Sequence, residues 1–320
     1  MASPPAIEAV DLVKRYGPNT AVDGVSFAVA PGSVLGLLGP NGAGKTTTVR
    51  MMTTLTKPTS GTARVAGFDV CTHPDQVRRH MGLTGQVATV DELLTGRENL
   101  RMIGGLLGIR RKHLVQLTDQ LLHQFSLSDA AERVVKSYSG GMRRRLDLAV
   151  SLLASPPVLF LDEPTTGLDP RSRSELWEVL RALVAQGTTL LLTTQYLEEA
   201  DQLADDIVVI DRGRIIAQGS PLELKQQAGR ASLVVTVADG ADLEAARALL
   251  AGTGTDVFVD AAARRLTASA DGLGDMIEVA GRLQDSGIAV DDIGLSRPSL
   301  DDVFLTLTGH RTEDTEEVSA

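Results

Sequence analysis

Short apolar runs alternate with helix-compatible stretches over the first 220 residues of this 320-residue chain. Four of these runs are continuously apolar, which is typical of strands buried on both faces of a parallel sheet. They are VLGLLG at 34–39, VLFLD at 158–162, TLLLTT at 189–194 and DIVVI at 206–210. The segment VSFAVA at 25–30 alternates instead, as an edge or half-exposed antiparallel strand does. The pattern predicts an α/β fold with a mostly parallel sheet covered by helices.

A mainly helical subdomain interrupts this pattern at about 90–155. No strand-like run occurs between 97 and 155, and apolar residues recur at helical spacing, as at Leu114, Leu117 and Leu121. The segment RGRIIAQGSP at 212–221 then predicts a strand and a turn. We place the whole first domain at residues 1–225.

Residues 229–310 predict a second, smaller α+β domain. Strand-like and helix-like segments follow one another there in the order βαββαβ. The segments are strand 232–238, helix 241–251, strands 255–260 and 264–270, helix 273–285 and strand 288–293.

The second domain ends in a predicted amphipathic helix, with Gly309 as its C-terminal cap. Leu300, Val303, Phe304 and Leu307 share one stripe of that helix and are expected to complete the core of the small domain. Residues 311–320 are polar and acidic, and we predict a disordered tail.

Charge and composition exclude several classes of function. The net charge is −10, yet residues 1–228 hold 24 basic and 24 acidic residues, so the excess lies in residues 229–320, with 7 and 17. Aromatic residues make up 3% of the chain, which together with the acidic region argues against nucleic acid as a partner. A single cysteine and five histidines without metal-ligand spacing argue against disulfides and zinc. No apolar run approaches membrane-spanning length. The first ten residues lack the basic and apolar regions of a secretory signal, which together with the single cysteine favours a cytoplasmic protein.

The strongest chemical signal is GPNGAGKTT, which follows the strand at 34–39 and precedes a helix-compatible stretch. It matches the phosphate-binding loop G-x-x-x-x-G-K-[ST] in the required strand, loop and helix context. Glycines allow the backbone N–H groups to converge on phosphate oxygens, Lys45 reaches the outer phosphates, and Thr46 offers a hydroxyl to Mg²⁺. The candidate nucleotide-binding residues are Gly39, Asn41, Gly42, Gly44, Lys45, Thr46 and Thr47.

VLFLDEP supplies two acids at the end of a buried strand. Asp162 is expected to hold the Mg²⁺ shell, and Glu163 is placed to polarise the attacking water. The apolar run before them indicates that they emerge from a core, which a solvated acidic pair on the surface would not do.

YSGGMRRR adds a second anion site, because Ser139, Gly140 and Gly141 precede a helix. One nucleotide does not need two such sites on one chain, but two copies arranged head to tail use both. For the basic run Arg143–Arg145 we expect a solvated or phosphate-complementing face.

Taken together, these motifs resemble those of ATP-binding-cassette (ABC) ATPases over about residues 6–220. The phosphate loop, Gln86, SGG, DEP, GLDP at 167–170 and a polar residue after TT occur in the family's order. The resemblance implies that Tyr16 stacks on adenine and that Gln86 senses Mg²⁺ and the transporter surface. It further implies that Ser139–Gly141 contact ATP of the opposing subunit and that Asp169 links the two sites. The signature departs from the family at Tyr138 and Met142.

Gln195 occupies the position that the family usually fills with a phosphate-sensing His. An amide can donate a hydrogen bond to phosphate but cannot carry a proton that titrates near neutral pH. We therefore expect Glu163 to be the principal base and hydrolysis to be slow, with Gln195 and Gln86 as further catalytic candidates.

The resemblance implies an ATPase with ATP and Mg²⁺ as cofactors, which works as a homodimer with a separately encoded membrane permease on the cytoplasmic face of the membrane. The stretch TTQYLEEADQLAD, together with the C-terminal domain, resembles the ATPase subunits of daunorubicin-resistance exporters. The alternatives are an exporter of lipid or polysaccharide and a soluble ABC ATPase of repair or ribosome-associated type. The 117 positions between Lys45 and Asp162 leave no room for a long coiled-coil insertion, which disfavours the soluble type.

Overall fold

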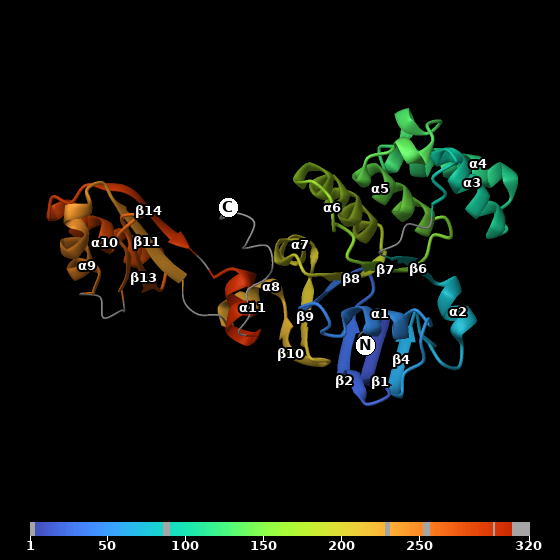
Figure 1. Cartoon of the computed structure of the whole chain (residues 1–320), viewed down its shortest axis with the longest axis horizontal. Coiled ribbons are helices and arrows are strands. Elements are labelled where there is room, and N and C mark those ends of the chain that lie inside the picture. Colours follow the sequence, from blue (N-terminus) through green and yellow to red (C-terminus); the bar gives the residue numbers. More distant parts are fainter. Residues whose placement is uncertain (1–3, 86–89, 228–230, 252–256, 297, 309–320) are drawn as a thin grey trace. The chain divides into compact units, whose positions relative to one another are not determined.

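The computed structural model describes residues 4–85, 90–227, 231–251, 257–296 and 298–308. The chain divides into two compact units, residues 1–221 and 222–320 (Figure 1). Within the described ranges, the first unit contains two sheets and the second contains one. Among the residues described, no helix is long and apolar enough to cross a membrane.

A six-stranded sheet forms the centre of the first unit, in the order β10-β9-β3-β8-β7-β6. β10 is antiparallel to β9, and all other neighbours are parallel. Every residue of β3, β7 and β8 is buried, which confirms the strands predicted from the continuous apolar runs. The strands are β3 Val34–Leu38, β6 Met81–Thr84, β7 Val158–Asp162, β8 Thr189–Thr194, β9 Asp206–Asp211 and β10 Arg214–Gly219.

A second, antiparallel sheet of the first unit has the order β2-β1-β4-β5. Its strands are β1 Ile7–Tyr16, β2 Asn19–Val29, β4 Ser60–Val65 and β5 Phe68–Asp69. β2 is an edge strand with buried and exposed positions alternating over its second half, as predicted for 25–30. An apolar cluster joins the two sheets and includes Ile7, Leu35 and Phe160, together with Met51 from helix α1.

The first unit also contains helices (Figure 1). They are α1 Lys45–Met52, α2 Pro74–Arg79, α3 Gly96–Leu106, α4 Arg111–Gln124, α5 Gly140–Ser151, α6 Pro170–Ala185 and α7 Leu197–Leu203. No strand occurs between 97 and 155, all of which is described, so the expected helical stretch is present. The helices α3 to α6 share one apolar cluster with β7 and β8, which includes Leu100, Leu146 and Trp177.

The second unit contains a four-stranded antiparallel sheet in the order β12-β13-β11-β14. The elements follow the predicted order βαββαβ, and the apolar cluster joins the sheet to α9 and α10. The elements are β11 Ala231–Val237, α9 Leu243–Ala251, β12 Val257–Asp260, β13 Arg265–Ala270, α10 Leu273–Asp285 and β14 Val290–Ser296.

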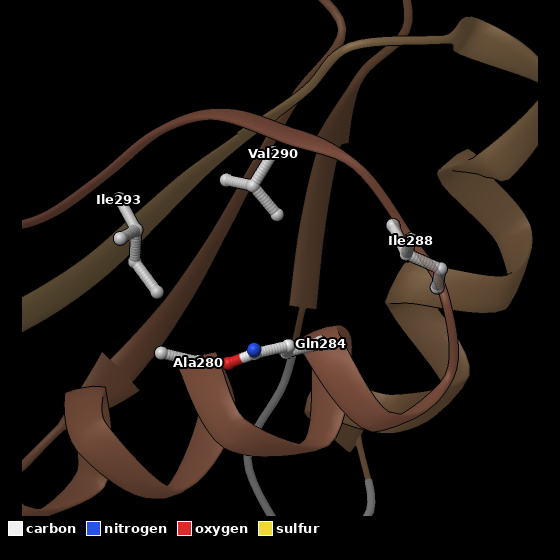
Figure 2. Close-up of a pocket in the computed structure, with 5 residues that line it drawn as sticks. All are labelled: Ala280, Gln284, Ile288, Val290 and Ile293. Carbon is white, nitrogen blue, oxygen red and sulfur yellow. The ribbon is translucent and has the colours of Figure 1, made fainter.

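A pocket of about 230 Å³ lies between α10 and the edge strand β14 (Figure 2). Its lining is aliphatic except for one amide, that of Gln284. The lining residues are Ala280, Gln284, Ile288, Val290 and Ile293.

Two further helices are α8, Pro221–Gln227, which begins at the last residue of the first unit, and α11, Leu300–Thr308, in the second unit. Leu300, Val303 and Phe304 of α11 are buried, as the stripe predicted. Within the described part of the chain, however, the apolar cluster of the β11–β14 sheet does not include them, so the expectation that they complete that core is wrong. Gly309 and the predicted tail at 311–320 lie outside the described residues.

Candidate functional site

The loop between β3 and α1 has the backbone that its glycines predict. Gly39, Gly42 and Gly44 all have positive φ, at 154°, 82° and 112°. A Cβ on Gly39 would collide with the carbonyl oxygen of Ile210, and one on Gly44 with that of Ala21. The loop therefore packs directly against backbone at both ends, and no larger residue fits there.

Lys45 begins α1 and folds back over the loop. Its side chain is buried, and Nζ donates to the carbonyl oxygens of Gly39 at 2.6 Å and Pro40 at 3.2 Å. The ammonium group therefore lies against the backbone of the loop between β3 and α1. Asn41, Gly42 and Thr47 belong to the same loop and first helical turn, and a Cβ on Gly42 would meet only open space.

The carboxylate of Asp162, at the end of β7, lies next to the loop. Thr46 Oγ1 donates to Asp162 Oδ1 at 3.4 Å, and Thr193 Oγ1 donates to the same oxygen at 2.5 Å. Glu163 follows with a left-handed backbone, φ 50°, which is uncommon for a residue other than glycine. Its N–H donates to both the carbonyl and the hydroxyl oxygen of Thr193, and these bonds hold the unusual conformation in place.

Three parallel strands bring these segments together. In the register of the sheet, Leu38 lies opposite Thr194, and Asp162 lies opposite Thr193. Because carboxyl ends of parallel strands meet at one edge, the residues that follow them also meet there. They are the loop from Gly39, Glu163 after β7 and the half-buried Gln195 after β8.

The SGG segment begins α5. Ser139 is the N-cap and its Oγ accepts from the Met142 N–H at 3.2 Å, while Ser139 and Gly140 are exposed. A Cβ on Gly141 would lie 2.6 Å from Ser172 Oγ, so α5 and α6 approach closely at this point.

Asp169 is the N-cap of α6 and is hydrogen-bonded to Ser172, the serine that lies close to Gly141. Its carboxylate accepts from the Ser172 N–H at 3.0 Å and from the Ser172 hydroxyl at 2.7 Å. These hydrogen bonds, the side-chain one first, lower the pKa of Asp169. Ser172 therefore connects Asp169 to Gly141 within one chain.

The candidate Tyr16 belongs to the antiparallel sheet. Tyr16 ends β1 with 49% of its surface exposed, and Lys14 Nζ lies 5.0 Å from its ring centroid. An exposed ring at a strand end is available for stacking. Gln86 lies outside the described residues.

Comparison with known proteins agrees with this geometry. The family described as ABC transporter matches residues 22–166. The daunorubicin resistance ATP-binding protein DrrA2 of Streptomyces coeruleorubidus is 55% identical over 98% of both chains. The chain belongs to the ABC transporter family.

Further relatives extend this likeness. The daunorubicin/doxorubicin resistance ATP-binding protein DrrA of Streptomyces peucetius is 50% identical over 98% of this chain and 96% of its own. The Nod factor export ATP-binding protein I of Ralstonia nicotianae is 42% identical over 98% and 97%. Among solved structures, an ATP-binding subunit of an ABC transporter matches 69% of this chain and 92% of its own, with a TM-score of 0.63 and 29% identity. The fold class expected from the sequence is thereby confirmed, and the chain is an ABC ATPase.

The departure at Tyr138 in this ABC ATPase has a structural explanation. Tyr138 is buried, and its hydroxyl donates to the Ala130 carbonyl at 2.7 Å. A Cβ on Gly96 would collide with that hydroxyl. The ring is therefore part of the apolar core of the helical subdomain, directly before the SGG turn.

The expectation for Arg143–Arg145 is wrong, because these side chains bind protein groups. Arg143 pairs with Glu92 at 2.9 Å, and Arg145 pairs with Glu175 at 3.3 Å. A basic run on a helix gives no sign of such partners, which lie far away in the sequence.

Arg144 is the functional neighbour that sequence reasoning missed. Burial lowers the pKa of this guanidinium, and nearby carboxylates, Asp147 first, oppose the shift. The guanidinium donates hydrogen bonds to four backbone carbonyls around the site, those of Pro164 (2.9 Å), Gly85 (2.6 Å), Asp162 (3.1 Å) and Glu163 (3.1 Å). Helix α5 is thereby attached to the segment that carries both acids.

Proposed function

We propose that this chain is the ATP-hydrolysing subunit that powers a multidrug or antibiotic efflux ABC transporter. The observation that carries the proposal is 55% identity to a daunorubicin resistance ATP-binding protein over 98% of both chains, which includes the C-terminal unit. Similarity confined to the cassette would support ATP turnover alone.

The donor set beside the phosphate loop fits Mg²⁺. The Thr46 hydroxyl and Asp162 carboxylate are hard oxygen donors 3.4 Å apart, and Mg²⁺ is usually held by one or two such groups together with substrate phosphates. No group of three His, Cys, Asp or Glu that could hold a metal occurs in the described residues, which fits this arrangement better than a closed protein cage. When bound, Mg²⁺ neutralises charge on the phosphates. Gln86 is a further proposed ligand.

Glu163 is the proposed base for the attacking water. Its left-handed backbone, held by Thr193, sets the direction of the side chain at the edge where the phosphate loop begins. Gln195 replaces the usual His and donates to phosphate without changing charge, so we propose slow turnover that depends on Glu163.

Two copies are proposed to close head to tail on two ATP molecules. Ser139 and Gly140 are exposed at the start of α5, which supports their contact with a phosphate from outside their own chain. Asp169 is proposed to connect the two sites, and Tyr16 to stack on adenine.

A separately encoded membrane permease is the proposed partner, which would place this chain on the cytoplasmic face of the membrane. The exposed apolar side chains of the helical subdomain support a docking surface there. The most exposed of them are Leu93 and Leu106, at 77% and 81%.

Export of a different cargo is the second candidate. The 42% identity to a Nod factor export protein also spans 98% of this chain, so the architecture serves more than one exported compound. An ATPase subunit does not itself line the substrate path.

The test is drug accumulation in a sensitive bacterial host that expresses this chain together with the membrane protein encoded beside it. We expect lower cellular daunorubicin than in cells with either protein alone, and loss of the difference with Glu163→Gln. Unchanged accumulation, with both proteins present in the membrane fraction, would contradict drug efflux.

A further inference from the structure

Glu199 is a buried carboxylate that the chemistry above does not use. It lies in the first turn of α7 with no exposed surface, although its neighbour Glu198 is exposed. A buried carboxylate needs hydrogen bonds or an opposite charge to offset the loss of water.

The groups around Glu199 supply only some of the hydrogen bonds that a buried carboxylate needs. Trp177 Nε1 donates to Glu199 Oε1 at 3.4 Å, and burial raises the pKa of the carboxyl to about 7. The hydroxyls of Thr194 and Thr165 and the guanidinium of Arg144 lower that pKa and so favour the charged form. In the described part of the chain, Oε2 makes no hydrogen bond of standard geometry, and neither does Thr165 Oγ1.

Each partner belongs to a segment that carries a proposed functional residue. Thr165 follows Glu163 by two residues, and Thr194 directly precedes Gln195. Trp177 lies on α6, the helix capped by Asp169, and Arg144 lies on α5, the helix capped by Ser139. Glu199 is therefore the common neighbour of four segments that end at the site.

An apolar side chain of similar size would be expected to pack here without this desolvation penalty. The presence of a carboxylate at this buried position is therefore better explained by the groups that it holds in place than by a contribution to stability. A carboxyl group can accept hydrogen bonds from hydroxyls and an indole N–H and, when charged, attract a guanidinium, which no apolar residue can do.

We propose that Glu199 is a positioning residue for ATP turnover, which holds the segments after β7 and β8 and the helices α5 and α6 in the arrangement that hydrolysis requires. It touches neither nucleotide nor metal in this proposal. Nucleotide binding at the loop after β3 should therefore not depend on it, whereas the hydrolytic step should.

The experiment measures kcat and KM for ATP in the presence of Mg²⁺ with the purified full-length chain, together with the stoichiometry and affinity of ATP binding by calorimetry. For Glu199→Leu we expect kcat per binding site to fall about tenfold or more, with KM changed less than about twofold. Glu199→Gln keeps an acceptor for Trp177 and should retain more activity than the Leu variant. Trp177→Phe, which removes one donor, should lower kcat about threefold.

Glu198→Gln is the matched control, because it removes a carboxylate from the same helical turn at an exposed position. It should leave kcat and KM at the wild-type values. Normalising kcat to measured ATP-binding sites separates loss of positioning from loss of folded protein.

Wild-type kcat in both Glu199→Gln and Glu199→Leu would overturn the inference, and so would a loss explained entirely by weaker ATP binding. The inference rests on the proposed function, and the two can be told apart. A wild-type chain that does not turn over ATP would overturn both, whereas wild-type turnover with insensitive Glu199 variants would overturn the inference alone.

Discussion

The two units of this chain bury different kinds of side chain. In the described residues, every buried polar or charged side chain lies between Lys45 and Glu199, within the first unit. The core of the β11–β14 sheet is formed by aliphatic residues. The first unit buries the side chains of a Lys, two Asp and a Glu, whereas among the described residues of the second unit only apolar side chains are buried.

This difference separates the residues that specify a fold from those that specify chemistry. Apolar patterning is sufficient for a βαββαβ layer, so substitutions there should change stability. Three buried polar residues of the first unit, Asp162, Thr193 and Thr194, lie where strands end, so substitutions at these positions should change turnover first.

The largest expected effect is that of Glu163→Gln. Removing the proposed base should lower ATP turnover at least about 100-fold while ATP still binds, because the phosphate loop is unchanged. Phosphate release and calorimetric ATP binding measure the two quantities. Turnover within tenfold of wild type would show that the base lies elsewhere.

Arg144→Met should affect both stability and turnover. It removes the guanidinium from four backbone carbonyls around the two acids, and we expect a loss of about 3 kcal/mol in the free energy of unfolding. Urea unfolding followed by the fluorescence of Trp177, the only tryptophan, reports the first unit.

Arg171→Met is the control for this substitution, because that side chain is 89% exposed. It should change the free energy of unfolding by less than about 0.5 kcal/mol. Equal midpoints for the two variants would show that the carbonyl contacts of Arg144 contribute nothing.

Leu266→Ala tests the apolar core of the second unit. Leu266 is fully buried in the second unit, and truncation should destabilise that unit by about 2–4 kcal/mol. Far-ultraviolet circular dichroism should show the shifted transition, while Trp177 fluorescence and ATP turnover stay at wild-type values. A matching shift of the fluorescence midpoint would show that the two units unfold together.

The smallest effect concerns pH. Burial raises the pKa of Glu199 from its ordinary value of 4.5 to about 7, so over this interval the folded state binds a proton that the unfolded state has lost. The contribution of this group is therefore favourable at low pH and is lost as pH rises toward 7. The melting temperature of Glu199→Gln, relative to wild type, should rise by a few degrees from pH 5 to pH 7 and then level off. A difference independent of pH would contradict a titrating buried carboxyl.

The sequence alone predicted those parts of the candidate site whose residues lie close together in the sequence. The phosphate loop, the acids Asp162 and Glu163 and the order of the C-terminal strands were each predicted from a short stretch of consecutive residues. Arg144 and Glu199 were missed because their partners come from other elements, such as Gly85, 59 positions before Arg144. A charged residue between the buried Leu197 and Ala200 was the one available signal for Glu199. The periodicity of α11 predicts a buried stripe, which the structure confirms for Leu300, Val303 and Phe304. Periodicity does not say which surface covers a helix.

The hydroxyl of Ser172 links the first turns of α5 and α6. It is hydrogen-bonded to Asp169 and lies where any side chain on Gly141 would have to be. Because Ser172 contacts both, the backbone at Gly141 and the carboxylate of Asp169 are held at a fixed spacing by one side chain. The first turns of α5 and α6 are thus connected through one serine side chain, and a larger residue at position 141 would have to displace it.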